Sequence, residues 1–221
     1  MKKSWVLAVA LGWICAAQQV PVTIPQTPEQ VSAELKRQLR GMADQHEDAI
    51  TGTPERPTGE SVSLYHLQHK APKAAIKSFD RAKKLSLAGD HAGAVAELER
   101  TLQIDPLSAG AYNLLGTEYG QLWRFDEAKR ALGRAVELDP SYWSAHFNLG
   151  LILFLLGDAA GAEQSARRAL AVASEEAQPH LLLGYLLYPH EATRAEGLEH
   201  LQYAARTVKE VRQFLRAIPE K

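Results

Sequence analysis

The sequence predicts an all-α protein, an α-solenoid of about four helix pairs that ends in a C-terminal capping helix. Short motifs recur at a fixed step of 34 residues: Leu115-Gly116 returns as Leu149-Gly150 and again as Leu183-Gly184. Within residues 109–140, apolar side chains recur at helical spacing in two short runs separated by a turn. A fixed period of this length is typical of helical repeats that bury their apolar faces on one another.

The residue types at the repeated positions suit closely packed helix pairs. Small residues such as Gly116 and Ala128 allow two helix backbones to approach, and large ones such as Tyr112 and Leu132 fill the space between them. Pro140 is expected to end the second helix, because proline cannot continue the hydrogen-bond ladder. By these residues the chain resembles the tetratricopeptide repeat (TPR) family.

The resemblance implies a right-handed superhelix of TPR helix pairs over residues 71–206, closed by a capping helix over residues 207–221. Gly89-Asp90 and Gly157-Asp158 are expected to supply the turn within a pair and the N-cap of its second helix. Trp123 replaces the glycine in the second repeat, so that turn either has another shape or is held by packing of the indole. Thr193 and Glu196 predict a capping box for the last second helix.

The first 17 residues have the pattern of a signal peptide. Lys2-Lys3 form a basic start, an apolar run follows, and Cys15-Ala16-Ala17 is a small-residue cleavage site. We expect cleavage after Ala17, which removes the only cysteine and leaves a periplasmic or secreted protein. Two alternatives remain: lipidation at Cys15, and retention of the uncleaved signal, either of which would tether the chain to a membrane.

Residues 18–70 are expected to form an N-terminal segment with one amphipathic helix and a linker. The helix begins near Thr27 and carries the apolar stripe Val31, Leu35, Leu39 and Met42, opposite the basic residues Lys36, Arg37 and Arg40. It either docks on the solenoid or serves as a dimerising or membrane-surface helix. Residues 51–60 have a linker composition, and residues 62–67 are expected to lie extended against the first repeat.

The sequence points away from catalysis and predicts no cofactor and no metal site. It lacks a phosphate-cradling glycine loop, a haem-attachment motif and a zinc-hydrolase helix. A formal net charge of −1, with lysine and arginine scattered along the chain, gives no reason to expect nucleic-acid binding. His66 and His69 could share a helix face as metal ligands, but two ligands without a third make a weak site.

The other histidines are expected to be structural. His146 and His180 occupy the repeat position of Tyr112, which predicts core or half-buried residues rather than a paired site. His190 and His200 have no persuasive partner in the sequence.

The resemblance instead implies binding of a protein or peptide in the concave groove. Mapped onto this chain, the groove would present Phe79, Lys83, Asn113, Thr117, Phe147, Leu151, Phe154, Leu181 and Tyr185. The family members that grip chaperone C-termini use Lys, Asn and Arg here, whereas this chain has Phe79, Lys83, Ser144 and Asn148, so that function is rejected.

An apolar groove suits an amphipathic helix or an extended apolar peptide. The expected function is therefore a non-enzymatic interaction module or scaffold of the cell envelope. The alternative is a self-assembling structural protein of the envelope whose own N-terminal segment fills the groove.

Overall fold

The structure is a computed structural model that describes residues 69–188, 190–208, 211–212 and 215. These residues fall into two compact units divided after Ser174, and each unit is described by itself. The predicted signal peptide, the predicted amphipathic helix with its linker, and most of the predicted capping helix lie outside the described residues. Among the described residues, no helix combines the length and hydropathy needed to cross a membrane.

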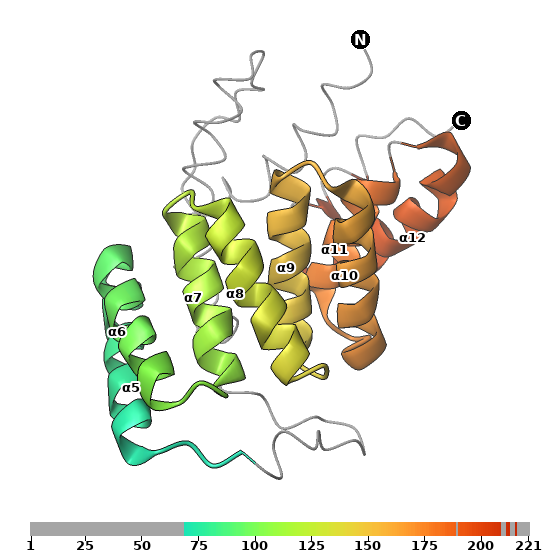
Figure 1. Cartoon of the computed structure of the whole chain (residues 1–221). Coiled ribbons are helices and arrows are strands. Elements are labelled where there is room, and N and C mark those ends of the chain that lie inside the picture. Colours follow the sequence, from blue (N-terminus) through green and yellow to red (C-terminus); the bar gives the residue numbers. More distant parts are fainter. Residues whose placement is uncertain (1–68, 189, 209–210, 213–214, 216–221) are drawn as a thin grey trace. The chain divides into compact units, whose positions relative to one another are not determined.

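The described part of the first unit consists of three helix pairs. The helices are α5 (Lys73–Leu87), α6 (His91–Ile104), α7 (Ala109–Gln121), α8 (Phe125–Leu138), α9 (Trp143–Leu155) and α10 (Ala159–Val172). Each helix packs on the next along the chain, and the first helices α7 and α9 also contact each other. In Figure 1 the pairs stand side by side in chain order. The prediction of an α-solenoid of TPR-like helix pairs is confirmed.

The turns within the pairs follow the expected chemistry. Gly89 and Gly157 have φ angles of 75° and 83°, in the left-handed region that glycine enters without steric cost. Asp90 and Asp158 then cap α6 and α10, each accepting a hydrogen bond of 2.9 Å from the backbone N–H three residues on.

Trp123 adopts the same backbone conformation as the two glycines, with a φ of 62°. The turn is closed by the backbone N–H of Arg124, which donates to the carbonyl of Tyr119 at 2.9 Å. The indole meets Phe125 edge to face, with ring centroids 5.3 Å apart. Of the two predicted alternatives, the structure thus has the packed one: the turn keeps its shape and aromatic contacts hold the indole.

The core of the first unit lies between the helices of each pair and between neighbouring pairs. One buried cluster joins side chains of α5 to α9, including Leu98, Leu114, Leu132 and Ile152. Gly116 lets α7 approach α8: a Cβ at this position would lie 2.5 Å from Cγ of Leu132 and 3.1 Å from the carbonyl oxygen of Ala128. Close packing of this kind leaves no room for even one methyl group.

The second unit contains α11 (Ala177–Leu187), the 3₁₀ turn η2 (Glu191–Thr193) and α12 (Arg194–Ala204). Gly184 repeats the role of Gly116, because a Cβ there would lie 2.6 Å from Leu201. Val211 is buried in the core cluster of α11 and α12, and Val208 and Leu215 pack against the same cluster.

The predicted capping box at Thr193 is wrong. Its hydroxyl donates instead to the carbonyl of Leu187 at 2.9 Å, and its side chain caps no helix N–H. The preceding 3₁₀ turn, which the sequence pattern did not indicate, redirects the side chain.

His146 is a buried residue of α9, as its repeat position predicted. Its Nε2 lies 3.0 Å from the carbonyl oxygen of Pro140, so the neutral ring donates its proton there. Burial lowers the pKa of the imidazole below its ordinary value, although the hydrogen bond to Pro140 acts in the opposite direction.

Gly116→Ala should lower the free energy of unfolding by about 1–3 kcal/mol, because the added methyl group forces α7 away from Leu132. Denaturant titration of the full chain measures this change. Gly133→Ala is the matched control, since a Cβ at this helical position meets nothing within 4 Å. It should raise stability by up to about 1 kcal/mol. Equal effects of the two substitutions would contradict the close approach at Gly116.

The pKa of His146 predicts a pH dependence of stability. With a lowered pKa, the folded state binds fewer protons at this ring than the unfolded state does, where histidine titrates near pH ~6.5. The free energy of unfolding that the neutral His146 ring contributes is therefore fully present above that pH, and it is lost as the pH falls below it. Relative to His146→Gln, which does not titrate, the wild type should lose stability between about pH 7.5 and about pH 5.5. A pH-independent difference between the two would contradict the assignment.

Candidate functional site

The first helices α5, α7 and α9 carry half-buried side chains at the positions that the repeat pattern assigns to the inner face. We define the first-helix face by Phe79 and Lys83 of α5, Thr117 of α7, and Asn148 and Leu151 of α9. Phe79 packs against the core cluster, and the Lys83 ammonium lies 5.9 Å from the centroid of its ring. The face therefore offers apolar surface beside a cation.

The other predicted groove residues differ in exposure. Asn113 and Phe147 are buried, with 1% and 7% of their surface exposed, whereas Phe154 at the end of α9 is 36% exposed. Leu181 belongs to the core cluster of the second unit, and Tyr185 packs against that cluster. Of the predicted set, Phe79, Lys83, Thr117 and Leu151 thus remain as half-buried residues of the first unit.

A chain of polar side chains joins α7 to α9 at this face. Asn148 donates through Nδ2 to the Oδ1 of Asn113 at 3.0 Å, and Asn113 donates to the hydroxyl of Tyr142 at 3.4 Å. Asn148 is only half-buried, and among the described residues its own carbonyl oxygen and its second N–H have no assigned partner. An amide with one free donor and one free acceptor can donate a hydrogen bond to a peptide carbonyl and accept one from a peptide N–H.

A second polar network, which the repeat pattern did not indicate, joins the first two repeats. The Glu118 side chain of α7 is 1% exposed to solvent. It accepts a hydrogen bond from the Ser86 hydroxyl of α5 at 2.6 Å and one from Nδ1 of His91 at 2.7 Å. These bonds satisfy a carboxylate whose burial would otherwise be unfavourable. Glu118 therefore positions three helices relative to one another.

The same network does not have the geometry of a hydrolase. A nucleophilic serine must donate to a neighbouring base, with a third group orienting that base. Here Ser86 and His91 both donate to Glu118, so the serine proton is directed at a carboxylate and not at the imidazole. The arrangement is a structural one.

Of the two histidines that could have shared a helix face as metal ligands, the structure describes only one. His69 lies 2.9 Å from Oδ1 of Asp105, and His66 lies outside the described residues. Within the described part of the chain, no three His, Cys, Asp or Glu side chains are grouped so that they could hold a metal ion.

The prediction that His200 has no partner is wrong. Its Nδ1 lies 2.7 Å from Nδ1 of His180, and the His180 ring also stacks on Tyr203 at 4.0 Å between centroids. His180 and His200 face each other because the pairing of α11 with α12 brings the two positions together, which spacing along the sequence cannot show.

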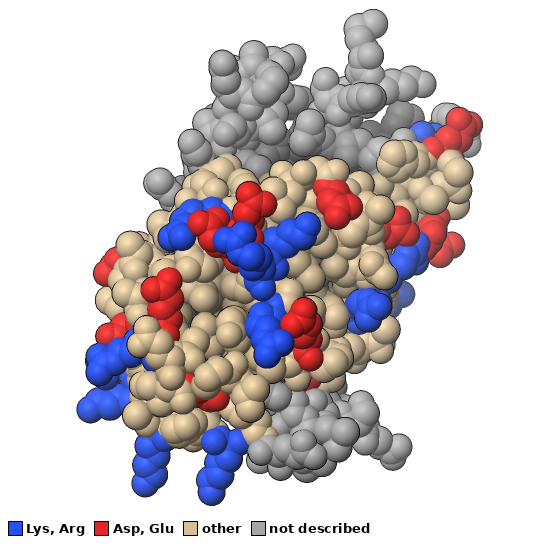
Figure 2. Space-filling view, in the orientation of Figure 1, with Lys and Arg blue, Asp and Glu red and all other residues tan. Residues whose placement is uncertain are grey.

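The charges on the surface are mixed. Figure 2 shows Lys and Arg interspersed with Asp and Glu on the face displayed, without a stripe of one sign. Several of them pair along or between helices, such as Arg134 with Glu137 and Arg167 with Glu163. Exposed pairs of this kind contribute little to stability and define no site.

Comparison with known proteins supports the repeat architecture. A family model described as "Tetratricopeptide repeat" matches residues 113–180. Anaphase-promoting complex subunit 3 of Schizosaccharomyces pombe is 24% identical over 110 residues, which are 44% of this chain and 16% of that protein. The chain thus covers less than a fifth of this curated relative.

Two solved structures share the fold. MamA from Desulfovibrio magneticus RS-1 superposes with a TM-score of 0.56 at 18% identity, over 62% of this chain and 77% of that one. A Thermobaculum terrenum O-GlcNAc transferase superposes with a TM-score of 0.54 at 28% identity, over 62% of this chain but only 27% of the enzyme. Over residues 113–180 the chain thus carries tetratricopeptide repeats, in agreement with its recurring Leu-Gly motifs and its stacked helix pairs.

Proposed function

We propose that this chain is a non-enzymatic interaction module that binds an extended, apolar peptide segment on the first-helix face. The observation that carries the proposal is the half-buried Asn148, one turn from the half-buried Leu151. Among the described residues, one N–H and the carbonyl oxygen of its amide have no partner. Residues three apart on a helix share a face, so a peptide that reaches one also reaches the other.

The side chains around Asn148 favour an extended peptide. Backbone groups of an extended segment are not paired internally, so each needs a donor or an acceptor from its receptor. Asn148 supplies one of each, and the bond to Asn113 fixes the orientation of its amide before the peptide arrives. A fixed amide loses little conformational entropy on binding, which strengthens the interaction.

The remaining groups of the face favour apolar peptide side chains and disfavour cationic ones. Phe79 and Leu151 supply apolar surface from α5 and α9, and each such side chain contributes roughly 1.5–3 kcal/mol when it is fully buried. Lys83, held beside the Phe79 ring, would repel a basic peptide and attract an acidic group at the edge of the face.

The relatives are consistent with this role without defining the partner. One is a subunit of a larger complex and another is a transferase of which the chain covers 27%. Each of them is matched over less than a third of its length, so neither the complex nor the transfer reaction is assigned to this chain.

The proposed location is the cell envelope or the exterior, since residues 1–17 have the pattern of a signal peptide. N-terminal sequencing that finds a mature chain beginning at Gln18 would support this location. An unprocessed chain, or a mature chain that begins with a lipidated Cys15, would place the protein at a membrane instead.

The experiment is a selection of peptides from a random display library on the full chain, followed by fluorescence anisotropy with the best peptide. Leu151→Glu should raise the Kd at least tenfold, because it places a charge where an apolar side chain is expected; about 1.4 kcal/mol corresponds to each factor of ten. Asn148→Ala should raise the Kd about fivefold, because the loss of one hydrogen bond costs about 1 kcal/mol of binding free energy.

Val172→Glu is the matched control, because Val172 is an exposed apolar residue of the second helix α10. It should leave the Kd unchanged, and all three variants should keep the helical circular dichroism of the parent. Equal losses in Leu151→Glu and Val172→Glu, or a chain that selects no peptide, would contradict binding at the first-helix face.

A further inference from the structure

The described array begins with α5, and no described helix pair precedes this helix (Figure 1). In the next repeat, Ala111 and Leu114 of α7 have no exposed surface, and they belong to the core cluster that includes side chains of α5 and α6. The period of 34 residues places Lys77 and Asp80 of α5 at these two positions, and both are exposed. The side of the helix that receives the preceding repeat in α7 is therefore charged in α5.

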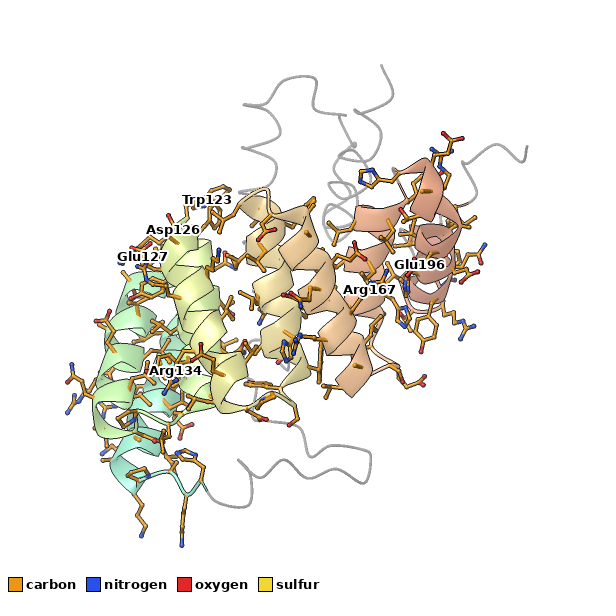
Figure 3. All side chains as sticks on the ribbon, turned by 45° about the vertical axis from the view of Figure 1, so that its right-hand side comes forward. Trp123, Asp126, Glu127, Arg134, Arg167 and Glu196 are labelled. Carbon is orange, nitrogen blue, oxygen red and sulfur yellow. The ribbon has the colours of Figure 1, made fainter. Side chains whose placement is uncertain are left out.

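Basic side chains are concentrated on this helix. Residues 70–87 contain six Lys or Arg residues and one acidic residue. We define the lysine row by the exposed Lys73, Lys77 and Lys84, which lie within a strip of about 40° along the helix. Among the described residues, none of these three lysines forms an ion pair. By contrast, Arg134 of α8 and Arg167 of α10, both labelled in Figure 3, each pair with a carboxylate of their own helix.

Two exposed apolar side chains lie beside the lysine row. Ile76 and Leu87 are 47% and 49% exposed. They are about three turns apart, so they share one side of α5, next to the row. This part of the helix thus offers cations together with apolar groups that solvent reaches.

The other charges of the first helix pair do not neutralise the lysine row. Besides the row, the Lys, Arg, Asp and Glu residues of residues 70–104 are Lys70, Arg81, Lys83 and Arg100, and Asp80, Asp90, Glu97 and Glu99. These four basic and four acidic residues balance, so the lysine row is the net positive charge of the pair. Three of the carboxylates are also engaged: Glu97 pairs with Arg81 at 3.4 Å, Glu99 accepts the Tyr119 hydroxyl at 3.0 Å, and Asp90 caps α6.

We propose that the lysine row attaches the first unit to an anionic membrane surface, with Ile76 and Leu87 entering the headgroup region. Each lysine close to an anionic bilayer raises the partition coefficient by about fivefold. The ammonium groups sit on flexible stems, so they can follow lipid phosphates without a fixed geometry. Apolar side chains beside a basic strip add contact with the acyl boundary. A further apolar helix would fit this side of α5 poorly, because it would bury uncompensated positive charge.

The shape of this surface favours a bilayer over a peptide. The buried side chains Ala75, Ala82 and Ser86 lie on the opposite side of α5, where α6 packs. Within the described part of the chain, the lysine row is therefore the convex side of a single helix, without a second wall. Peptides are held in grooves or along strand edges, whereas a bilayer receives the convex side of a helix.

The lysine row is separate from the first-helix face. Phe79, which belongs to that face, lies at least about 120° around α5 from each lysine of the row. A membrane at the lysine row thus leaves the first-helix face accessible to a peptide. The proposal does not rest on the proposed function, because the row is available whether or not a peptide binds.

Vesicle binding by the full chain tests the proposal. The probes are vesicles of phosphatidylcholine alone and vesicles that also contain about one third phosphatidylglycerol, an anionic lipid. The test variant removes the lysine row by Lys73→Gln, Lys77→Gln and Lys84→Gln. The matched control removes three exposed charges from the second helices α8 and α10 by Lys129→Gln, Arg130→Gln and Arg168→Gln.

At low salt, the parent should partition onto the anionic vesicles. Loss of the lysine row should lower its partition coefficient at least about tenfold, whereas the control should change it less than about twofold. Raised salt should weaken the binding of the parent, because it screens the lysine charges. Equal losses in the two variants, or equal binding of the parent to both kinds of vesicle, would overturn the proposal.

A dye on α5 reports whether this helix itself meets the bilayer. In a Cys15→Ser background, Leu87→Cys carries an environment-sensitive dye, and Val172→Cys on α10 is the control, since Val172 is 42% exposed. On anionic vesicles the emission should shift to the blue at position 87 and stay unchanged at position 172. Equal shifts at both positions, or none at 87, would contradict the proposal. Binding of polyglutamate by a chain that ignores the vesicles would show that the row receives an acidic polypeptide instead. Circular dichroism checks that each variant keeps the parent fold.

Discussion

The close approach of the two helices within a repeat is the constraint on which the rest of the structure depends. At Gly116 there is no room for a Cβ beside Leu132, and at Gly184 there is none beside Leu201. Each short helix is marginal alone and becomes stable only by burying its apolar side chains on its partner. The next pair then packs on the exposed side of the first, which aligns α5, α7 and α9 at successive positions of the array.

Buried polar groups add specificity to this apolar packing. Glu118 holds Ser86 and His91, and Asn113 joins Asn148 to Tyr142, so neighbouring repeats are connected by directional bonds as well as by contact area. A network that is satisfied disfavours alternative packings, because any shift would leave a buried polar group without a partner. The same bonds hold Asn148 ready for a ligand, so the rigidity of the array and the proposed binding have a common source.

The sequence was sufficient for the fold because the fold repeats. Leu-Gly steps and Gly-Asp turns recur at a fixed period, and each has one local physical meaning. Contacts that depend on three-dimensional register were not visible in the sequence: the Glu118 network, the His180–His200 pair and the rotation of Thr193 away from its helix. The predicted groove did not account for burial, since Asn113 and Leu181 are used inside the protein.

Hydrogen–deuterium exchange of the full chain, with and without a saturating selected peptide, tests the central claim most directly. If the first-helix face is the binding surface, exchange should slow in peptide fragments from α7 and α9 and from the part of α5 around Lys83, while α6, α8 and α10 change little. Protection centred on the second helices, or protection confined to residues after Ser174, would contradict the account.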